Sequence, residues 1–270
     1  FMTQSIVTPK RSASIFSELT NVINTWPIWF LMGNQDIKLR YKRSIIGPFW
    51  ISLTLAAWIA GISILYAQIL KQPFLDYLVF LSCGLLAWNM ISAVISEGSV
   101  SVIDNSSHLM SAPMPLSIFA ARVVYRNIIV FFHNMLVVVC VLIYAKVHIT
   151  WAMLFLPVGL LINCLILFFF ISVSGPLCAR FRDLQQIISN LLQVSFFLTP
   201  IIWQTGQIGG RTLVTHANPF YHMIELIRAP LMGYIPSTDT LIASGVMLIG
   251  GLIAALIVWR YSRKRVIFWL

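Results

Sequence analysis

The stretch VHITWAMLFLPVGLLINCLILFFFISVSGPLCA (residues 147–179) contains no Asp, Glu, Lys or Arg over 33 residues. About 20 mostly apolar residues are enough for a helix to cross a ~30 Å hydrocarbon core. Five further uncharged stretches are long enough: 44–70, 77–96, 127–145, 184–210 and 240–259. The sequence therefore predicts an all-α integral membrane protein with six transmembrane helices. We place these helices at about residues 47–70, 77–96, 124–145, 151–174, 185–203 and 240–259.

The composition excludes an ordinary soluble domain. Hydrophobic residues make up 59% of the 270 residues and charged residues 10%, with a mean hydropathy of +0.88, whereas soluble domains carry about 25% charged residues. The four cysteines lie in or beside apolar stretches without CxxC spacing, so we interpret them as buried hydrophobic residues. Residues 1–46 are too polar for a signal peptide, so we expect the N-terminus to stay in the cytoplasm.

The cations predict the orientation. Four of the 18 Lys and Arg residues fall on one side of the six predicted helices, and the other 14 fall on the side that holds both termini. The four are Lys71, Lys146, Arg211 and Arg228. Since Lys and Arg favour cytoplasmic loops, both termini are predicted to be cytoplasmic. The net charge of +10 then largely reflects the cations that fix the orientation of the helices in the membrane. It indicates anionic membrane lipids as partners rather than nucleic acid.

Four segments outside the predicted spans have their own character. Within the cytoplasmic residues 1–46, apolar positions recur at helical spacing beside Trp and basic residues, which predicts an amphipathic helix in the membrane interface. Packing on a soluble partner is the alternative. Residues 98–110 are predicted to form a short cytoplasmic helix, a natural lever for a partner protein. Residues 205–232 are too apolar for an ordinary outer loop and predict re-entrant helices. Residues 261–270 form a basic, aromatic cytoplasmic tail.

Motifs for catalysis are missing from the sequence. It has no GxxxxGK[ST] phosphate loop, no HExxH and no His/Cys cluster at metal-binding spacing. None of the eight acidic residues lies in the middle of a predicted span. Ion-coupled transporters usually keep an ionisable group there, so this pattern disfavours both a secondary transporter and a carboxylate-based membrane enzyme.

The predicted spans carry aromatic and mildly polar residues instead. Aromatic faces suit the C–H surfaces of sugars, and amides offer weak hydrogen bonds, so these residues are candidates for a glycan path. The candidates are Trp50, Trp58, Tyr66, Trp88, Asn89, Asn190, Gln193, Phe196 and Phe197. The alternative interpretation treats the rings as interfacial belts and the amides as bonds between helices.

Four stretches resemble the membrane subunit of ABC-2 type polysaccharide exporters, the family of O-antigen, teichoic acid and capsule exporters. They are RYKRSIIGPFW (40–50), RFRDLQQIISNLLQVSFFLTPIIW (180–203), NPFYHMIELIRAPLMG (218–233) and RYSRKRVIFWL (260–270). They occur in the order expected for the family. The third stretch is more similar to the O-antigen branch than to the capsule branch.

The resemblance implies a single six-helix ABC-2 domain (47–260) that forms a homodimer in the bacterial inner membrane. Two ATP-binding cassette subunits would bind ATP and Mg, so no cofactor is expected in this chain. The resemblance also implies an interfacial helix at about 15–43, re-entrant helices at 205–232 and a coupling helix at 98–110. The expected coupling residues are Ser99, Val102, Asp104, Asn105 and His108. Spans one, two and five would line the conduit.

The function expected from these features is export of a polysaccharide linked to a polyprenyl pyrophosphate. Phosphate favours cations through charge-assisted hydrogen bonds. The cations expected to meet it are Lys38, Arg40, Lys42, Arg43, Arg122 and Arg126. A capsule or teichoic acid exporter and an ABC-2 exporter of small amphiphiles remain alternatives. A membrane enzyme or assembly factor acting on lipid-linked glycans is another.

Overall fold

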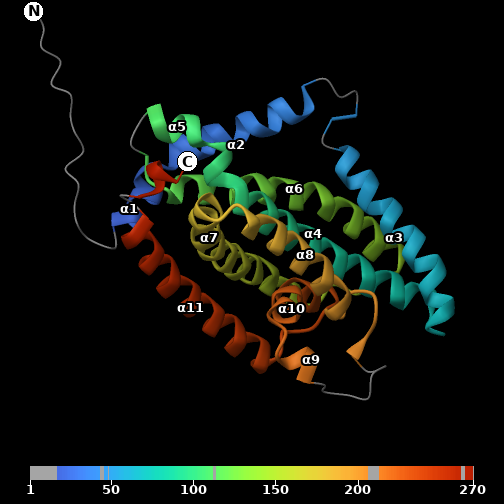
Figure 1. Ribbon diagram of the computed structural model, residues 1–270. Helices are drawn as coiled ribbons and strands as arrows, with labels where there is room; N and C mark the ends of the chain where they lie inside the picture. The colour runs from blue at the N-terminus through green and yellow to red at the C-terminus, as the bar shows by residue number, and fades with distance from the viewer. Residues whose placement is uncertain are drawn as a thin grey trace, which may run out of the picture.

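The computed structural model describes residues 17–42, 46–47, 49–111, 114–205, 213–262 and 265–269, and every regular element in them is helical. The predicted all-α class is therefore confirmed for these residues (Figure 1). The elements are α1 (Ser17–Asn24), α2 (Trp26–Tyr41), α3 (Phe49–Ile69), α4 (Phe74–Asp104), α5 (Ser106–Ser111), α6 (Ser117–Tyr144), η1 (Trp151–Phe155), α7 (Leu156–Arg180), α8 (Asp183–Leu198), α9 (Leu213–His216), α10 (Pro219–Leu231), α11 (Thr238–Ser262) and η3 (Val266–Phe268).

Five helices in the described part of the chain are long and apolar enough to cross a membrane. They are α3, α4, α6, α7 together with η1, and α11. The predicted fifth span (185–203) corresponds to α8, which has 16 residues and is therefore only about 24 Å long. It falls short because Thr199 is extended, with φ −89° and ψ 137°, as expected for a residue that precedes a proline. Six full-length spans are thus not observed.

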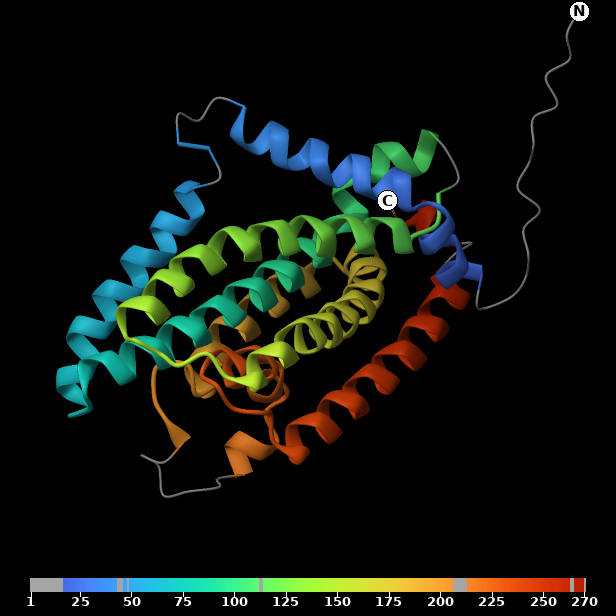
Figure 2. The ribbon, with the colours of Figure 1, turned by 180° about the vertical axis from the view of Figure 1, so that it is seen from behind.

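The chain ends of the described region lie at the same end of the bundle. In Figures 1 and 2, α1, α2, α5 and the red end of the ribbon lie together, whereas α9, α10 and the turn between α3 and α4 lie at the opposite end. We call these the α2 end and the α10 end. The ribbon shows α8 leading from the end of α7 towards α10, so it carries the chain between the two ends despite its length.

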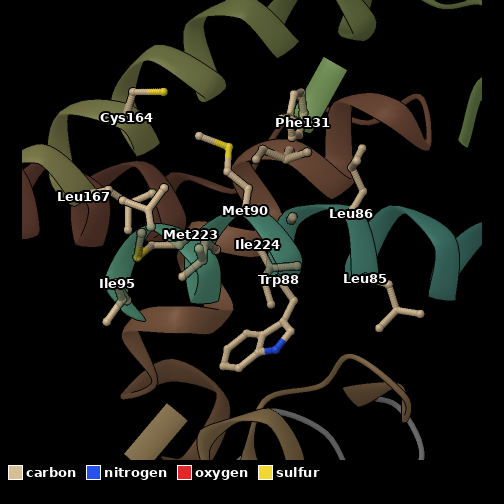
Figure 3. Packing of buried hydrophobic residues seen from close by; sticks show 14 of the residues in the cluster. Leu85, Leu86, Trp88, Met90, Ile95, Phe131, Cys164, Leu167, Met223 and Ile224 are labelled. Atoms are coloured by element: carbon tan, nitrogen blue, oxygen red, sulfur yellow. The ribbon is translucent and has the colours of Figure 1, made fainter. Parts of the chain in front are cut away.

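Helix α4 is the centre of the bundle. Within its most apolar 18-residue stretch 83% of the residues are buried, against 11% in α11. It packs against α3, α6, α7, α8 and α10. Figure 3 shows its side chains Leu86 and Met90 among Phe131 of α6, Cys164 of α7 and neighbouring apolar groups. Helices α3 and α6, by contrast, have only 22% of the residues buried in their most apolar stretches and leave most of that surface to lipid or to a partner.

Helix α4 continues well past residue 96, where we expected the second span to end. Glu97 ends the uncharged run in the sequence, but its carboxylate is neutralised by Arg126 and Arg40 and does not end the helix. Beyond it, a Cβ built on Gly98 would lie 2.3 Å from Cγ2 of Ile171 in α7. The missing side chain therefore lets α4 and α7 approach closely. Residues 98–104 are the last turns of α4, and only α5 is a separate short helix.

Helix α10 lies against α4, α7, α11 and η1 at the α10 end. Its apolar face is buried there, with Ile224 and Ile227 fully covered and Leu231 nearly so. A Cβ on Gly159 of α7 would lie 2.2 Å from the Leu226 carbonyl oxygen. The backbone of α10 therefore occupies the space that a side chain at position 159 would need. The Asn163 amide of α7 also donates to the Met223 carbonyl at 2.8 Å. Of the region expected to be re-entrant (205–232), residues 206–212 lie outside the described residues, and α10 is tightly packed against the bundle.

Candidate functional site

Helix α2 lies across the α2 end and packs along the start of α6. Tyr125 of α6 contacts the rings of Trp29 and Phe30, with centroids 5.7 and 5.0 Å away. A Cβ on Gly33 would lie 2.6 Å from Cδ1 of Tyr125, so the glycine admits the ring. The expected interfacial helix at 15–43 is thus two helices, α1 and α2, joined at Thr25 just before a proline in the first turn of α2.

Five charged side chains join α2, α4 and α6 at this end, and we call them the clasp: Asp36, Arg40, Glu97, Arg122 and Arg126. Arg122 donates to both oxygens of Asp36, with Nε 2.7 Å from Oδ2. Arg126 donates to Asp36 at 3.0 Å and to Glu97 at 2.6 Å. Arg40 donates to the other oxygen of Glu97 at 2.9 Å. Each carboxylate therefore holds two arginines, and each helix is tied to the other two.

The contacts of the clasp favour the charged forms of Asp36 and Arg40. Burial tends to raise the pKa of Asp36, but the hydrogen bond and charge of Arg122, with help from Arg126, outweigh it and lower that pKa below 3.8. Burial likewise tends to lower the pKa of Arg40, and the contact with Glu97 outweighs it and raises that pKa. Three cations face two anions, so the clasp keeps a net positive charge.

The structure separates the six cations expected to meet a phosphate. Arg40, Arg122 and Arg126 are engaged in the clasp. Lys38 and Lys42 are exposed near the C-terminal end of α2. Arg43 lies outside the described residues. The two lysines are therefore the described cations of this set whose ammonium groups face outward without a carboxylate on them.

The residues expected to couple to a partner do not share one surface. Ser99 and Val102 are buried within α4 and cannot touch another protein. Asp104 and His108 are exposed at the α4–α5 junction and on α5. Asn105, between the two helices, accepts from Arg122 Nη1 at 2.6 Å and donates to its own helix. The expected lever is thus α5 with the exposed end of α4, linked to the clasp through Asn105.

Helix α3 carries the aromatic surface that the sequence suggested. Trp50, Trp58 and Tyr66 line one open groove of about 570 Å³, and the first two rings are mostly exposed. Leu53, Thr54, Ala57, Gly61, Ile62 and Leu65 complete its wall. The groove begins just after the exposed lysines of α2 and runs along the helix towards the α10 end.

Trp88 does not belong to an open path. It is only 8% exposed, and its ring packs between Phe196 of α8 and Phe220 of α10, with centroids 5.7 and 5.6 Å away. Figure 3 shows the indole directed away from the other labelled core side chains. It fastens α8 and α10 to α4. Phe196 is half-buried in this contact, while Phe197 is exposed.

The amides expected on the path are exposed but engaged locally. Asn89 donates to the Leu85 carbonyl of its own helix at 2.9 Å. Asn190 accepts from Gln186 Nε2 at 3.0 Å, one turn earlier in α8. Gln193 is exposed on the same helix. Neither of these two bonds joins two helices, so the interhelical alternative does not describe Asn89 or Asn190.

A second charged group, which the sequence placed only as an outer cation, lies at the α10 end. Arg228 is 3% exposed and donates two hydrogen bonds to Glu225, one turn earlier in α10. Its Nη1 donates to the Pro200 carbonyl at 2.6 Å, and the guanidinium lies 4.3 Å from the centroid of the Phe80 ring. Arg228 therefore joins α10 to the end of α8 and to α4. Residues three apart lie on one face of a helix, but this spacing does not tell that the ion pair is buried.

Sequence reasoning also missed the two anchors of the clasp, Asp36 and Glu97. The one available signal was the spacing of Arg122 and Arg126, four residues apart and so on one face of α6. That face needed an acidic partner. Within the described residues, no group of three or more His, Cys, Asp or Glu side chains is placed to hold a metal ion.

A family model described as "ABC-2 type transporter" matches residues 28–232, which is most of the chain and ends before α11. The chain belongs to the ABC-2 type transporter family. An O-antigen export system permease, RfbA of Myxococcus xanthus, is 26% identical over 214 residues, which cover 77% of this chain and 82% of that protein. Two RfbA permeases of Klebsiella pneumoniae are 23% and 24% identical over 200 and 197 residues, covering 72% of this chain and 76% of each relative.

Membership of this family confirms the resemblance and makes the protein a multi-pass membrane protein of a transporter. ATP-binding cassette subunits are the partners that membership implies, and the chain is the transport subunit rather than the ATPase. The clasp lies at the same end of the bundle as α5.

Proposed function

We propose that the protein is the permease subunit of an ATP-driven exporter that moves polyprenyl-pyrophosphate-linked polysaccharide across a bacterial inner membrane. The relatives named as O-antigen export permeases support an O-antigen-like glycan. Capsule and teichoic acid exporters of the same family are the alternatives for the glycan. The positive-inside pattern supports a cytoplasmic α2 end with both termini on that side, and it supports an outer α10 end where α9 and α10 re-enter.

One observation carries the proposal. Exposed Lys38 and Lys42 lie at the point where α2 leads into α3, whose aromatic groove begins at Trp50. A pyrophosphate is attracted to such cations at the membrane surface, while a sugar chain can slide over ring faces. The clasp beneath the lysines keeps a net positive charge and fixes the angle of α2.

The path needs a second copy of the chain. The α3 groove is open along its length, and the exposed apolar face of α8, including Leu191 and Phe197, is open as well. A homodimer that covers both surfaces would enclose them and remove them from lipid. Binding along such a path has to be weak and repeated, because a tight site would halt the polymer.

Coupling to the ATPase falls to the lever formed by α5 and the exposed end of α4. Asp104 and His108 are the expected contact residues, and Asn105 would pass movement of α5 to Arg122 and so to α2. The two cassette subunits would hold ATP and Mg, and this chain would hold neither. Ser99 and Val102 act only as buried support.

The test is charge removal at matched positions. The double variant Lys38→Gln/Lys42→Gln should lower glycan export about tenfold or more, because each phosphate contact with a cation is worth roughly 1.5–3 kcal/mol. The matched control is Lys71→Gln/Lys146→Gln, which removes the same charge from exposed lysines at the α10 end and should export normally. Membrane insertion and dimer formation should match wild type in both. Full export by the Lys38/Lys42 variant would remove the head-group role.

A further inference from the structure

A second, smaller group of buried apolar side chains lies at the α2 end, apart from the main core. It consists of Val102, Leu109, Leu116, Phe119, Ala179 and Val266, and we call it the end cluster. Met32, Ile103, Met114 and Trp269 pack around it. Its members come from α4, α5, the start of α6, α7 and η3, so it joins elements that are distant in sequence. The motif at 260–270 that carried part of the family resemblance thus has a structural place.

The segment 265–269 returns to the bundle after α11. Val266 is 2% exposed within the end cluster, and η3 contacts both α5 and α7. The Arg180 guanidinium at the end of α7 lies 5.4 Å from the Trp269 ring centroid and 5.0 Å from that of Phe181. In both ribbon views the red end of the chain lies beside α5 (Figures 1 and 2). Phe268, between these two anchored residues, is 86% exposed.

Helix α5 depends on this support. It has six residues, far fewer than an isolated helix needs to persist in water. Leu109 is its one buried side chain, and that side chain sits in the end cluster with Val266. On the other side α5 is held through Asn105, which Arg122 contacts. The orientation of α5 therefore rests on a polar contact at its start and on the seat of Leu109 in the end cluster, which η3 helps to form.

We propose that residues 265–269 position α5 for the ATPase: Val266 and Trp269 brace Leu109 so that His108 and Met110 face the partner subunit. This inference rests on the proposed function, in which α5 contacts a cassette subunit. Val266 and Trp269 are positioning residues and touch neither ATP nor glycan. Without this support, a push by the partner subunit would deform α5 and would not be passed on to the clasp.

The experiment uses the full chain with its cassette partner in nanodiscs. Val266→Ala/Trp269→Ala should raise amide hydrogen exchange over residues 106–111 by about tenfold, because a local unit that loses its few buried contacts opens more often. The same variant should hydrolyse several times more ATP per exported glycan than wild type. Phe268→Ala is the matched control, since it removes an aromatic ring that is mostly exposed, and should change neither quantity. The single variant Trp269→Phe retains Val266 and keeps a ring over Arg180, so it should keep most of the coupling that the double variant loses.

Two outcomes would overturn the inference. Exchange over 106–111 within twofold of wild type in Val266→Ala/Trp269→Ala would show that the segment does not hold α5. Impaired coupling in Phe268→Ala with normal coupling in the double variant would show that the segment is a contact surface and not a support. The exchange measurement needs no transport, so it separates failure of the brace from failure of the proposed function, which would appear as absent glycan export by the wild-type complex.

Discussion

The two ends of the molecule hold their charges in different ways. At the α10 end Arg228 is 3% exposed and depends on a single carboxylate, a carbonyl and an aromatic face. At the α2 end three arginines share two carboxylates, and the side chains of Asp36, Arg122 and Arg126 remain 13–17% exposed. A buried charge with one counterion has no substitute when that ion is lost. A network near water has substitutes, so we expect the α10 end to be rigid and the α2 end to be able to rearrange.

The largest effect should come from removing the single carboxylate. Glu225→Gln leaves Arg228 buried without a counterion and should lower the free energy of unfolding by about 3–5 kcal/mol, measured by denaturation in mixed micelles. Removing both charges, in Glu225→Leu/Arg228→Met, should cost less than half as much, because apolar replacements of a buried pair are often tolerated. Equal losses in the two variants would mean that packing, and not charge, fixes this corner.

Helix contacts give the next test. Gly159→Ala places a Cβ 2.2 Å from the Leu226 carbonyl oxygen, whereas Gly98→Ala meets the Ile171 side chain at 2.3 Å. Overpacking costs about 1–3 kcal/mol, and Gly159→Ala at the α10 end should cost more, because a backbone carbonyl cannot rotate away as a side chain can. Gly245→Ala is the control, with nothing within 4 Å of its Cβ, and should be neutral in thermal unfolding. A greater loss of stability in Gly98→Ala than in Gly159→Ala would mean that the helix contact at the α2 end is the less tolerant one.

Substitutions in the clasp should lower the free energy of unfolding less than those at the α10 end. They should impair the coupling of ATP hydrolysis to glycan export more. Asp36→Asn removes the carboxylate that two arginines share, and we expect a loss of about 1–2 kcal/mol, together with a raised ratio of ATP hydrolysed to glycan exported. Arg40→Gln should cost under about 1 kcal/mol, because the Arg40 side chain is 41% exposed and water screens the pair. If both variants keep wild-type coupling, the clasp is a static fastening like the one at the α10 end.

The smallest effect concerns pH. The folded pKa of Asp36 is lowered, so its contribution to stability is fully present above the ordinary value of 3.8 and is lost as pH falls through the lower folded value. Stability should therefore change little through Asp36 between about pH 5 and 8. Below about pH 4 the wild type should lose stability more steeply than Asp36→Asn. Parallel curves for the two proteins down to about pH 2 would contradict this assignment.

Uncharged stretches were a good guide to the membrane helices and a poor guide to their ends. Glu97 interrupts the apolar run but not α4, because Arg126 and Arg40 neutralise it. Residues 199–203 extend the apolar run but not α8, because Thr199 is extended before Pro200. Both errors have one cause. Where a helix ends depends on backbone hydrogen bonds and ion pairs. Composition indicates only which residues prefer an apolar surrounding.

The residues of the candidate site stay predictions as to their roles. Lys38, Lys42, Trp50 and Trp58 lie on exposed surfaces, which leaves the proposed contacts with phosphate and glycan open to test. The clasp could not be predicted, because Asp36 and Arg122 are brought together only by packing of α2 on α6. The burial of Trp88 could not be predicted either. In a helix that is apolar on all sides, periodicity does not tell which face meets the core.

The most direct test of the account is transport by the purified complex. The protein and its cassette partner would be reconstituted in liposomes with a polyprenyl-pyrophosphate-linked glycan, and ATP-dependent appearance of the glycan on the far side would be measured. We expect wild type to move the glycan only with ATP, and Lys38→Gln/Lys42→Gln to move it about tenfold more slowly than Lys71→Gln/Lys146→Gln. ATP-dependent movement of small amphiphiles without any movement of the glycan would contradict the account.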